Sequence, residues 1–195
     1  MIFSLKNKIA VIGLIAAVLA GFGLYMTTLS SSNSNGGAME MRYVADFSDD
    51  KNVVDMYSNL FVGKITKVAK QTNVQGIPVT LFEAEVVRNI KGDLKGTVVV
   101  LQTAGFRETE GGKKFASIGS GKLMEEGETY LLATGYDKMV TEQEGRDVYT
   151  ILTHPNGSKL LSEDTELTLD QLKTVANNDQ KVKAWEEVYN SAETE

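Results

Sequence analysis

The chain has 195 residues, no cysteine, one histidine and a formal net charge of −6. Disulfides, zinc sites built from histidine and cysteine, and lipid attachment to a cysteine are therefore excluded. All 26 acidic residues lie beyond residue 39, so the acidic character of that part disfavours non-specific binding of nucleic acid.

The run 9–29 carries no charged side chain. As a helix, its 21 residues would be about 31 Å long, which matches the roughly 30 Å hydrocarbon core of a membrane. Lys6 and Lys8 precede the run, and such positive flanks stay in the cytoplasm. We therefore predict a cytoplasmic stub at 1–8, a single-pass transmembrane signal anchor in the cell membrane at 9–29, and an extracytoplasmic remainder.

Two other interpretations of this run stay open. A cleaved signal peptide would leave a secreted protein, although the apolar region of signal peptides is usually shorter, about 7–15 residues. A buried core helix would belong to the domain itself. The polar residues that follow predict a flexible linker at 30–42, before an extracytoplasmic domain at 43–192. An exported domain without cysteine fits a bacterial source.

The domain is predicted to contain one short helix, then five strands. Residues 48–50 are suited to cap the helix. The first strand changes its apolar phase at Gly63, which indicates a bulge or a sharp bend. The predicted helix covers 51–58, and the predicted strands cover 60–68, 79–90, 97–102, 129–134 and 147–153.

The connections are predicted from glycine content and polarity. The glycine-rich stretch 103–122 has no clear period, so we expect a long loop, with a short irregular strand near 115–118. Polar turns are expected at 142–146 and at 154–158.

The chain is predicted to end in helices. Thr168 and Gln171 have the spacing of a capping box, and apolar residues then recur at helical intervals. A second helical stretch at 180–190 carries Trp185 on its apolar side. We expect this indole to pack against the strands.

Five short segments carry a family resemblance: FVGKI at 61–65, FEAEV at 82–86, KG at 91–92, GETYLL at 127–132 and LDQL at 169–172. Together they resemble the TIMP-like, or netrin-type (NTR), OB-fold domain. The resemblance implies a mainly β fold: a five- to six-stranded OB-like (TIMP-like) Greek-key barrel with C-terminal helices, whose rim loops bind partners. Tissue inhibitors of metalloproteinases chelate zinc through an N-terminal cysteine, and that mechanism does not carry over to a chain without cysteine.

Patterns for catalysis and metal binding are weak in this sequence. A Ser-His-Asp set would depend on His154, which we expect to be a turn residue. Residues 116–123 depart from a phosphate-binding loop at both ends. The acidic clusters at 46–50 and 125–128 do not match an EF-hand and are interpreted as solvated turns. We therefore predict no enzymatic activity, no metal, no cofactor, and no nucleotide or nucleic-acid partner.

Glu83 and Glu85 keep one enzymatic hypothesis open. As paired carboxylates on one face of a strand, they would suit a hydrolase that uses acidic residues. The simpler interpretation is the solvent face of a half-buried strand, with Lys67 or Arg88 near enough to pair with them.

The stretch 103–122 offers the best candidate for recognition. Aromatic and arginine side chains are common anchors of interfaces, and basic residues stand out in an acidic domain. The competing interpretation is a floppy connection whose aromatics tuck back onto the barrel. The candidate partner-binding residues are Phe106, Arg107, Lys113, Lys114 and Phe115.

These observations favour a membrane-anchored extracytoplasmic binding module. Its N-terminal helix would hold it in the membrane, and its barrel-rim loops would recognise a protein or a cell-wall polymer. The alternative is an exported protease inhibitor that acts by loop insertion, without a zinc-chelating N-terminal cysteine.

Overall fold

The computed structural model describes residues 45–74, 76–118 and 122–192. The stub, the signal anchor and the linker expected at 1–42 lie outside these residues, so the membrane anchor stays a prediction. Within the described part, no helix is long and apolar enough to cross a membrane. The described residues all belong to one compact unit, Gly36–Glu195.

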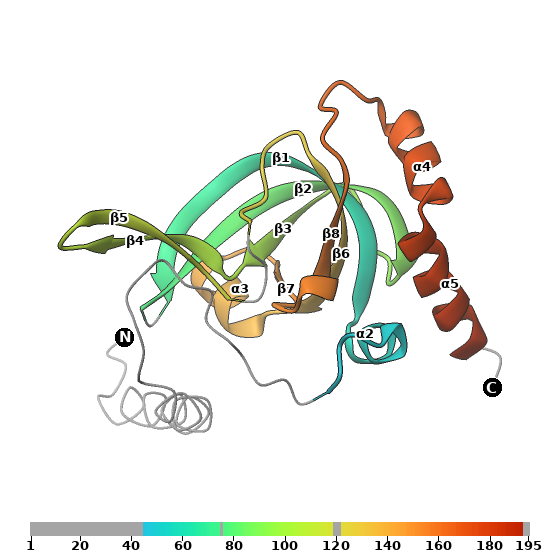
Figure 1. The fold of residues 1–195 in the computed structure, drawn as a ribbon, viewed down its shortest axis with the longest axis horizontal. Helices are drawn as coiled ribbons and strands as arrows, with labels where there is room; N and C mark the ends of the chain where they lie inside the picture. Colours follow the sequence, from blue (N-terminus) through green and yellow to red (C-terminus); the bar gives the residue numbers. More distant parts are fainter. Residues whose placement is uncertain (1–44, 75, 119–121, 193–195) are drawn as a thin grey trace, which may run out of the picture. The chain divides into compact units, whose positions relative to one another are not determined.

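The described part is mainly β, with helices at its carboxyl end (Figure 1). Its strands are β1 (Asn59–Val74), β2 (Ile77–Lys91), β3 (Thr97–Gln102), β4 (Ala104–Thr109), β5 (Gly112–Ser117), β6 (Thr129–Tyr136), β7 (Val148–Ile151) and β8 (Ser158–Ser162). Its helices are α2 (Asp50–Met56), α3 (Lys138–Glu144), α4 (Leu169–Asn178) and α5 (Gln180–Ala192), with a 3-10 turn, η1, at Pro155–Gly157.

Six of these strands form one partly closed sheet. Its order is β1-β2-β3-β7-β6-β8, and β1 also pairs with β6, so the sheet curls back on itself. Neighbouring strands are antiparallel except β3 and β7, which run parallel. Figure 1 shows β1 and β2 arching over the other strands of this sheet.

The long strand β1 bends because its pairing with β2 shifts register repeatedly. One shift falls between Val62 and Gly63, where the sequence predicted a bulge or a sharp bend. A Cβ on Gly63 would lie 2.9 Å from the Phe61 ring, closer than real side chains approach. The bent strand buries Leu60 and Val62 in one apolar cluster, and Phe61 and Ile65 in another.

The buried side chains form three apolar clusters. One is built mainly from strand residues and contains Phe82. A second joins the strands to α2, α4 and α5 and contains Leu172 and Trp185. The third packs Val140 of α3 against β2, β3 and β7. The domain therefore has a substantial core without any disulfide.

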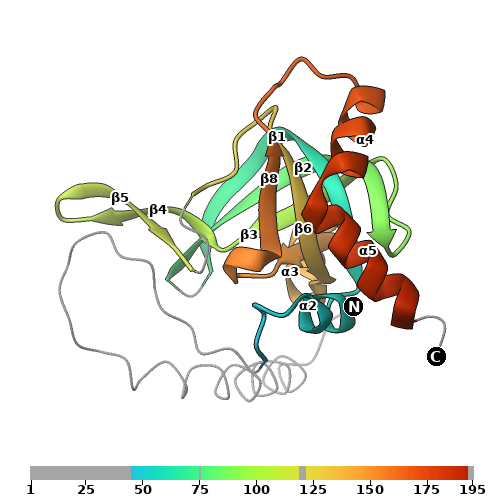
Figure 2. The same cartoon turned by 45° about the vertical axis from the view of Figure 1, so that its right-hand side comes forward.

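The two predicted terminal helices are confirmed. Thr168 and Gln171 make the capping box at the start of α4. Trp185 is only 1% exposed, and its indole Nε1 donates a hydrogen bond of 3.0 Å to Asp50 Oδ1. Lys181 pairs with the same carboxylate. These contacts tie α5 to α2, which lies at its side in Figure 2.

Two predicted connections are wrong. The expected loop at 103–122 contains the hairpin β4–β5, and most of the expected turn at 142–146 belongs to α3. The expected turn at 154–158 is confirmed by η1, but the strand β8 that follows it was not predicted. Each missed element is short and buries few side chains, so it leaves no clear apolar period in the sequence.

Candidate binding surface

The hairpin β4–β5 is fixed at its base by two polar contacts. Thr80 Oγ1, on β2, donates a hydrogen bond of 2.8 Å to the carbonyl of Ala104. The backbone N–H of Ile118 donates to the carbonyl of Thr103 at 2.9 Å and closes the hairpin. At the end of β3, the buried Gln102 accepts from Met124 N and donates to Lys122 O. The base of the hairpin is therefore positioned by the main sheet.

Beyond this base the hairpin projects away from the six-stranded sheet (Figures 1 and 2). In the part of the chain that the structure describes, β4 and β5 pair only with each other. Glu110 and Gly111 make the turn, and Gly112 follows with a φ of 96°, which L side chains rarely adopt. An isolated two-stranded hairpin is only marginally stable in water, so a partner that packs against it would stabilise it.

The register divides the five predicted residues between the two faces of the hairpin. Phe106 lies opposite Phe115, and their ring centroids are 5.7 Å apart in an edge-to-face arrangement. Arg107 lies opposite Lys114, one position along on each strand and hence on the other face. Phe106 is 47% exposed, so its ring does not tuck back onto the barrel.

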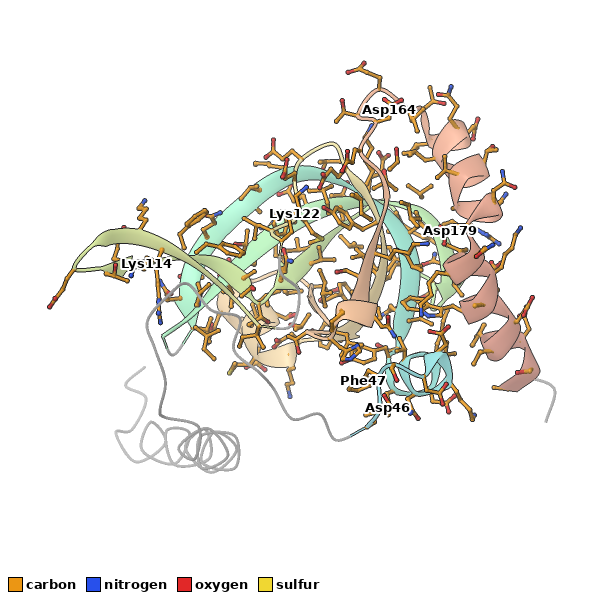
Figure 3. The ribbon with its side chains drawn as sticks, viewed as in Figure 1. Asp46, Phe47, Lys114, Lys122, Asp164 and Asp179 are labelled. Carbon is orange, nitrogen blue, oxygen red and sulfur yellow. The ribbon has the colours of Figure 1, made fainter. Side chains whose placement is uncertain are left out.

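The two faces also differ in charge. On the aromatic face, Lys113 Nζ lies 3.7 Å from Glu108 Oε1. On the other face, no ion pair joins Arg107 or Lys114 to another of the described residues. Like charges directly opposite each other destabilise a strand pair. Figure 3 shows Lys114 on the projecting hairpin, far along it from the sheet. We call Phe106, Arg107, Lys114 and Phe115 the hairpin surface.

The carboxylate pair considered for a hydrolase is arranged differently. Glu83 Oε1 accepts a hydrogen bond of 3.1 Å from Arg146, while Arg88 pairs with Glu186 on α5. Neither Lys67 nor Arg88 has an ion pair with Glu83 among the described residues. Arg146 comes from the segment before β7, so its pairing could not be found from neighbouring sequence.

Glu128 is buried, which corrects the expectation that residues 125–128 form a solvated turn. Its carboxylate accepts from the Tyr130 hydroxyl, from Lys122 Nζ at 3.1 Å and from Glu125 N at 3.1 Å. Burial favours its neutral form, but these hydrogen bonds outweigh burial and lower the pKa of Glu128. Burial first, and then this carboxylate, raise the pKa of Tyr130. The network fixes the turn that precedes β6.

Across residues 45–74, 76–118 and 122–192, no group of three or more histidine, aspartate or glutamate side chains is placed to hold a metal ion. His154 is a turn residue, as predicted: its Nδ1 accepts from Asn156 N at 3.2 Å and caps η1. Burial lowers the pKa of His154, although Asp46 acts against this.

An open cleft of about 600 Å³ lies where β3 and β7 begin. Glu83 and Arg146 contribute to its lining, together with residues on either side of these strand starts. This cleft could not be predicted from the sequence, because its lining residues come from three separate parts of the chain.

Comparison with known proteins adds no relative to this picture. No protein-family model matches the sequence, and no curated protein matches it.

Proposed function

We propose that this protein is a membrane-anchored extracytoplasmic binding module and that it captures a protein with an acidic surface through the hairpin surface. The observation that carries the proposal is the projecting hairpin β4–β5. It has an aromatic pair with an exposed Phe106 ring on one face and two cations without ion-pair partners among the described residues on the other.

The proposal includes an OB-like (TIMP-like) Greek-key barrel as the scaffold. Three pairings support it: β1 with β2, β1 with β6, and the parallel pair β3–β7. In such a barrel the strands hold projecting segments at the rim, where partners can reach them. The apolar run 9–29 and its two preceding lysines support the membrane anchor.

A protein suits the hairpin better than a wall polymer does. The outer edge of each hairpin strand offers backbone donors and acceptors that a polypeptide strand can pair with. Phe106 supplies apolar area at the same place, and aromatic and arginine side chains are frequent hot spots of protein interfaces. Carboxylates on the partner would relieve the repulsion between Arg107 and Lys114.

The experiment is site-specific photocrosslinking of the full chain in the cells that produce it. A photoreactive phenylalanine analogue replaces Phe106, and a second variant carries it in place of Met139, an exposed residue on α3. We expect a discrete protein adduct from position 106 that is absent from position 139. Arg107→Ser combined with Lys114→Ser should reduce the yield about tenfold or more, because two charge contacts are lost together.

Two matched variants separate the local effect from net charge. Lys138→Ser with Lys173→Ser removes the same charge from α3 and α4, and the adduct should persist. Glu108→Gln with Lys113→Gln removes the ion pair on the aromatic face without changing net charge. Equal adduct yields from the Arg107→Ser/Lys114→Ser variant and the Lys138→Ser/Lys173→Ser variant would contradict the proposal. If proteases leave the adduct intact but a cell-wall hydrolase degrades it, the partner of the hairpin surface is a cell-wall polymer.

A further inference from the structure

The cleft at the starts of β3 and β7 is separate from the hairpin surface and shares no residue with it. β3 begins at the cleft with Thr97 and ends at Gln102, just before the hairpin. The volume of about 600 Å³ falls within the range of small-molecule sites, about 300–1,000 Å³. The cleft can therefore be considered a site in its own right.

Both apolar and polar residues line the cleft. Leu94, Val98 and Val99 line it, and all three are almost fully buried. Lys95 and Thr97 line it as exposed residues at the approach to β3. A surface of this kind suits a ligand that has both apolar faces and polar edges.

One tyrosine ring lines the cleft, and a second ring packs against it outside the lining. Tyr149 on β7 lines it and lies opposite Tyr136 on β6, with ring centroids 5.9 Å apart at an interplanar angle of 67°. Tyr136 is 51% exposed, and its hydroxyl donates a 3.5 Å hydrogen bond to Asp147 Oδ1. An exposed ring held by a neighbouring ring and a carboxylate provides a stacking platform without a role in the core.

The charges around the cleft are mixed. Asp93, Asp147 and Glu83 supply carboxylate acceptors, while Lys95 and Arg146 supply donors. Arg146 is bound to Glu83, but neither Asp93 nor Lys95 makes an ion pair within the described part of the chain. Burial and then the charges of Asp147, Tyr136 and Asp93 raise the pKa of Tyr149. No single sign of charge dominates, so neither a phosphate nor a polyamine is favoured.

The geometry points to a binding site for the neutral sugar rings of an oligosaccharide in this cleft. The C–H face of a sugar would stack on Tyr149, which lines the cleft, and on the exposed Tyr136 ring beside it, and its hydroxyl groups would donate to Asp93 and Asp147 and accept from Lys95. Sugars present these two kinds of surface on every ring, which a wholly apolar or a singly charged ligand does not.

The test is calorimetric titration of the full chain, held in a detergent without a sugar headgroup. The neutral probes are N-acetylglucosamine tetramer, cellotetraose and maltotetraose; tetragalacturonate and spermine serve as charged probes. We expect at least one neutral tetramer to bind, and Tyr136→Ala to weaken it about tenfold through loss of the stacking ring. Tyr136→Phe keeps the ring and should retain most of the affinity.

Further variants distinguish the cleft from the rest of the surface. Asp93→Asn with Lys95→Gln should weaken the same tetramer, while Phe106→Ala on the hairpin should leave its affinity unchanged. Sedimentation with chitin or cellulose particles is run in parallel. It distinguishes an insoluble polymer from a free oligosaccharide as the source of the bound sugar rings. Binding of charged probes only, binding of none, or full affinity in Tyr136→Ala would overturn the assignment. Because Phe106 is not part of the cleft, failure here leaves the proposed hairpin function standing.

Discussion

Replacing Glu128 by glutamine tests how much the buried carboxylate contributes to stability. Its side chain is only 7% exposed and receives hydrogen bonds from Tyr130, Lys122 and the backbone of Glu125. Glutamine offers one acceptor oxygen where glutamate offers two, so at least one of these donors would face an N–H₂ group. A hydrogen bond to a buried charge contributes about 1.5–3 kcal/mol.

The contribution of Lys122 is smaller, because its side chain is 59% exposed and water screens the pair. We therefore expect Glu128→Gln to lower the free energy of unfolding by about 2 kcal/mol at neutral pH, with a fall of roughly 4–8 °C in melting temperature. Urea unfolding of the full chain, followed by circular dichroism, measures the loss. Glu125→Gln is the matched control, since Glu125 is exposed and should change stability by less than about 0.5 kcal/mol.

The effect has a defined pH dependence. Because the pKa of Glu128 is lower in the folded protein than its usual 4.5, the ionised carboxylate stabilises the fold above pH 4.5. That contribution is lost as the pH falls through the folded-state pKa, whereas glutamine does not titrate. The difference in the free energy of unfolding between the unsubstituted protein and Glu128→Gln should persist at neutral pH and decrease on acidification. Equal free energies of unfolding at neutral pH, or a difference that increases in acid, would refute a stabilising role of the ionised Glu128 carboxylate.

Three further substitutions probe the fold. Gly63→Ala should destabilise by about 1–3 kcal/mol, because its Cβ would meet the Phe61 ring at 2.9 Å; thermal melting measures this, and an unchanged melting temperature would contradict the packing. Trp185→Ala should cost about 3–5 kcal/mol and release Asp50, seen as faster amide exchange in α2; unchanged exchange there would count against the α2–α5 contact. Gly112→Val should remove amide protection in β4 and β5 only, since φ is 96° in a hairpin outside the main sheet; a cooperative loss across all strands would show that the hairpin belongs to the core.

Apolar periodicity was enough to predict five of the six strands of the main sheet, but not β8, whose side chains are mostly half-buried. The third strand was predicted at its observed limits, Thr97–Gln102, because both of its faces are buried and the apolar run is continuous. The bulge at Gly63 was also predicted, since a change of apolar phase is what a register shift produces. β1 and β2 extend beyond the predicted limits, into a segment where β1 is largely exposed and the pattern fades.

The hairpin was missed for the opposite reason. Its strands bury side chains only at the base. Phe106 and Arg107 lie on opposite faces but are both exposed, so the strand shows no alternation of buried and exposed residues. The sequence still drew attention to this segment, because aromatic and basic side chains among glycines are unusual in an acidic chain. Their division into an aromatic and a cationic face required the register, which short sequence patterns do not supply.

The strand β3 links the two proposed sites. Its first residue lines the cleft and its last residue precedes the hairpin, and at about 3.3 Å per residue the two ends are roughly 17 Å apart. Val99 and Val100 are buried between β2 and β7, so the strand is held rigidly on both sides. A sugar in the cleft and a protein on the hairpin would thus be held at a fixed separation and would not compete for the same residues. Either binding site can therefore be removed by substitution while the other is retained. The two proposals can thus be tested separately within one folded chain.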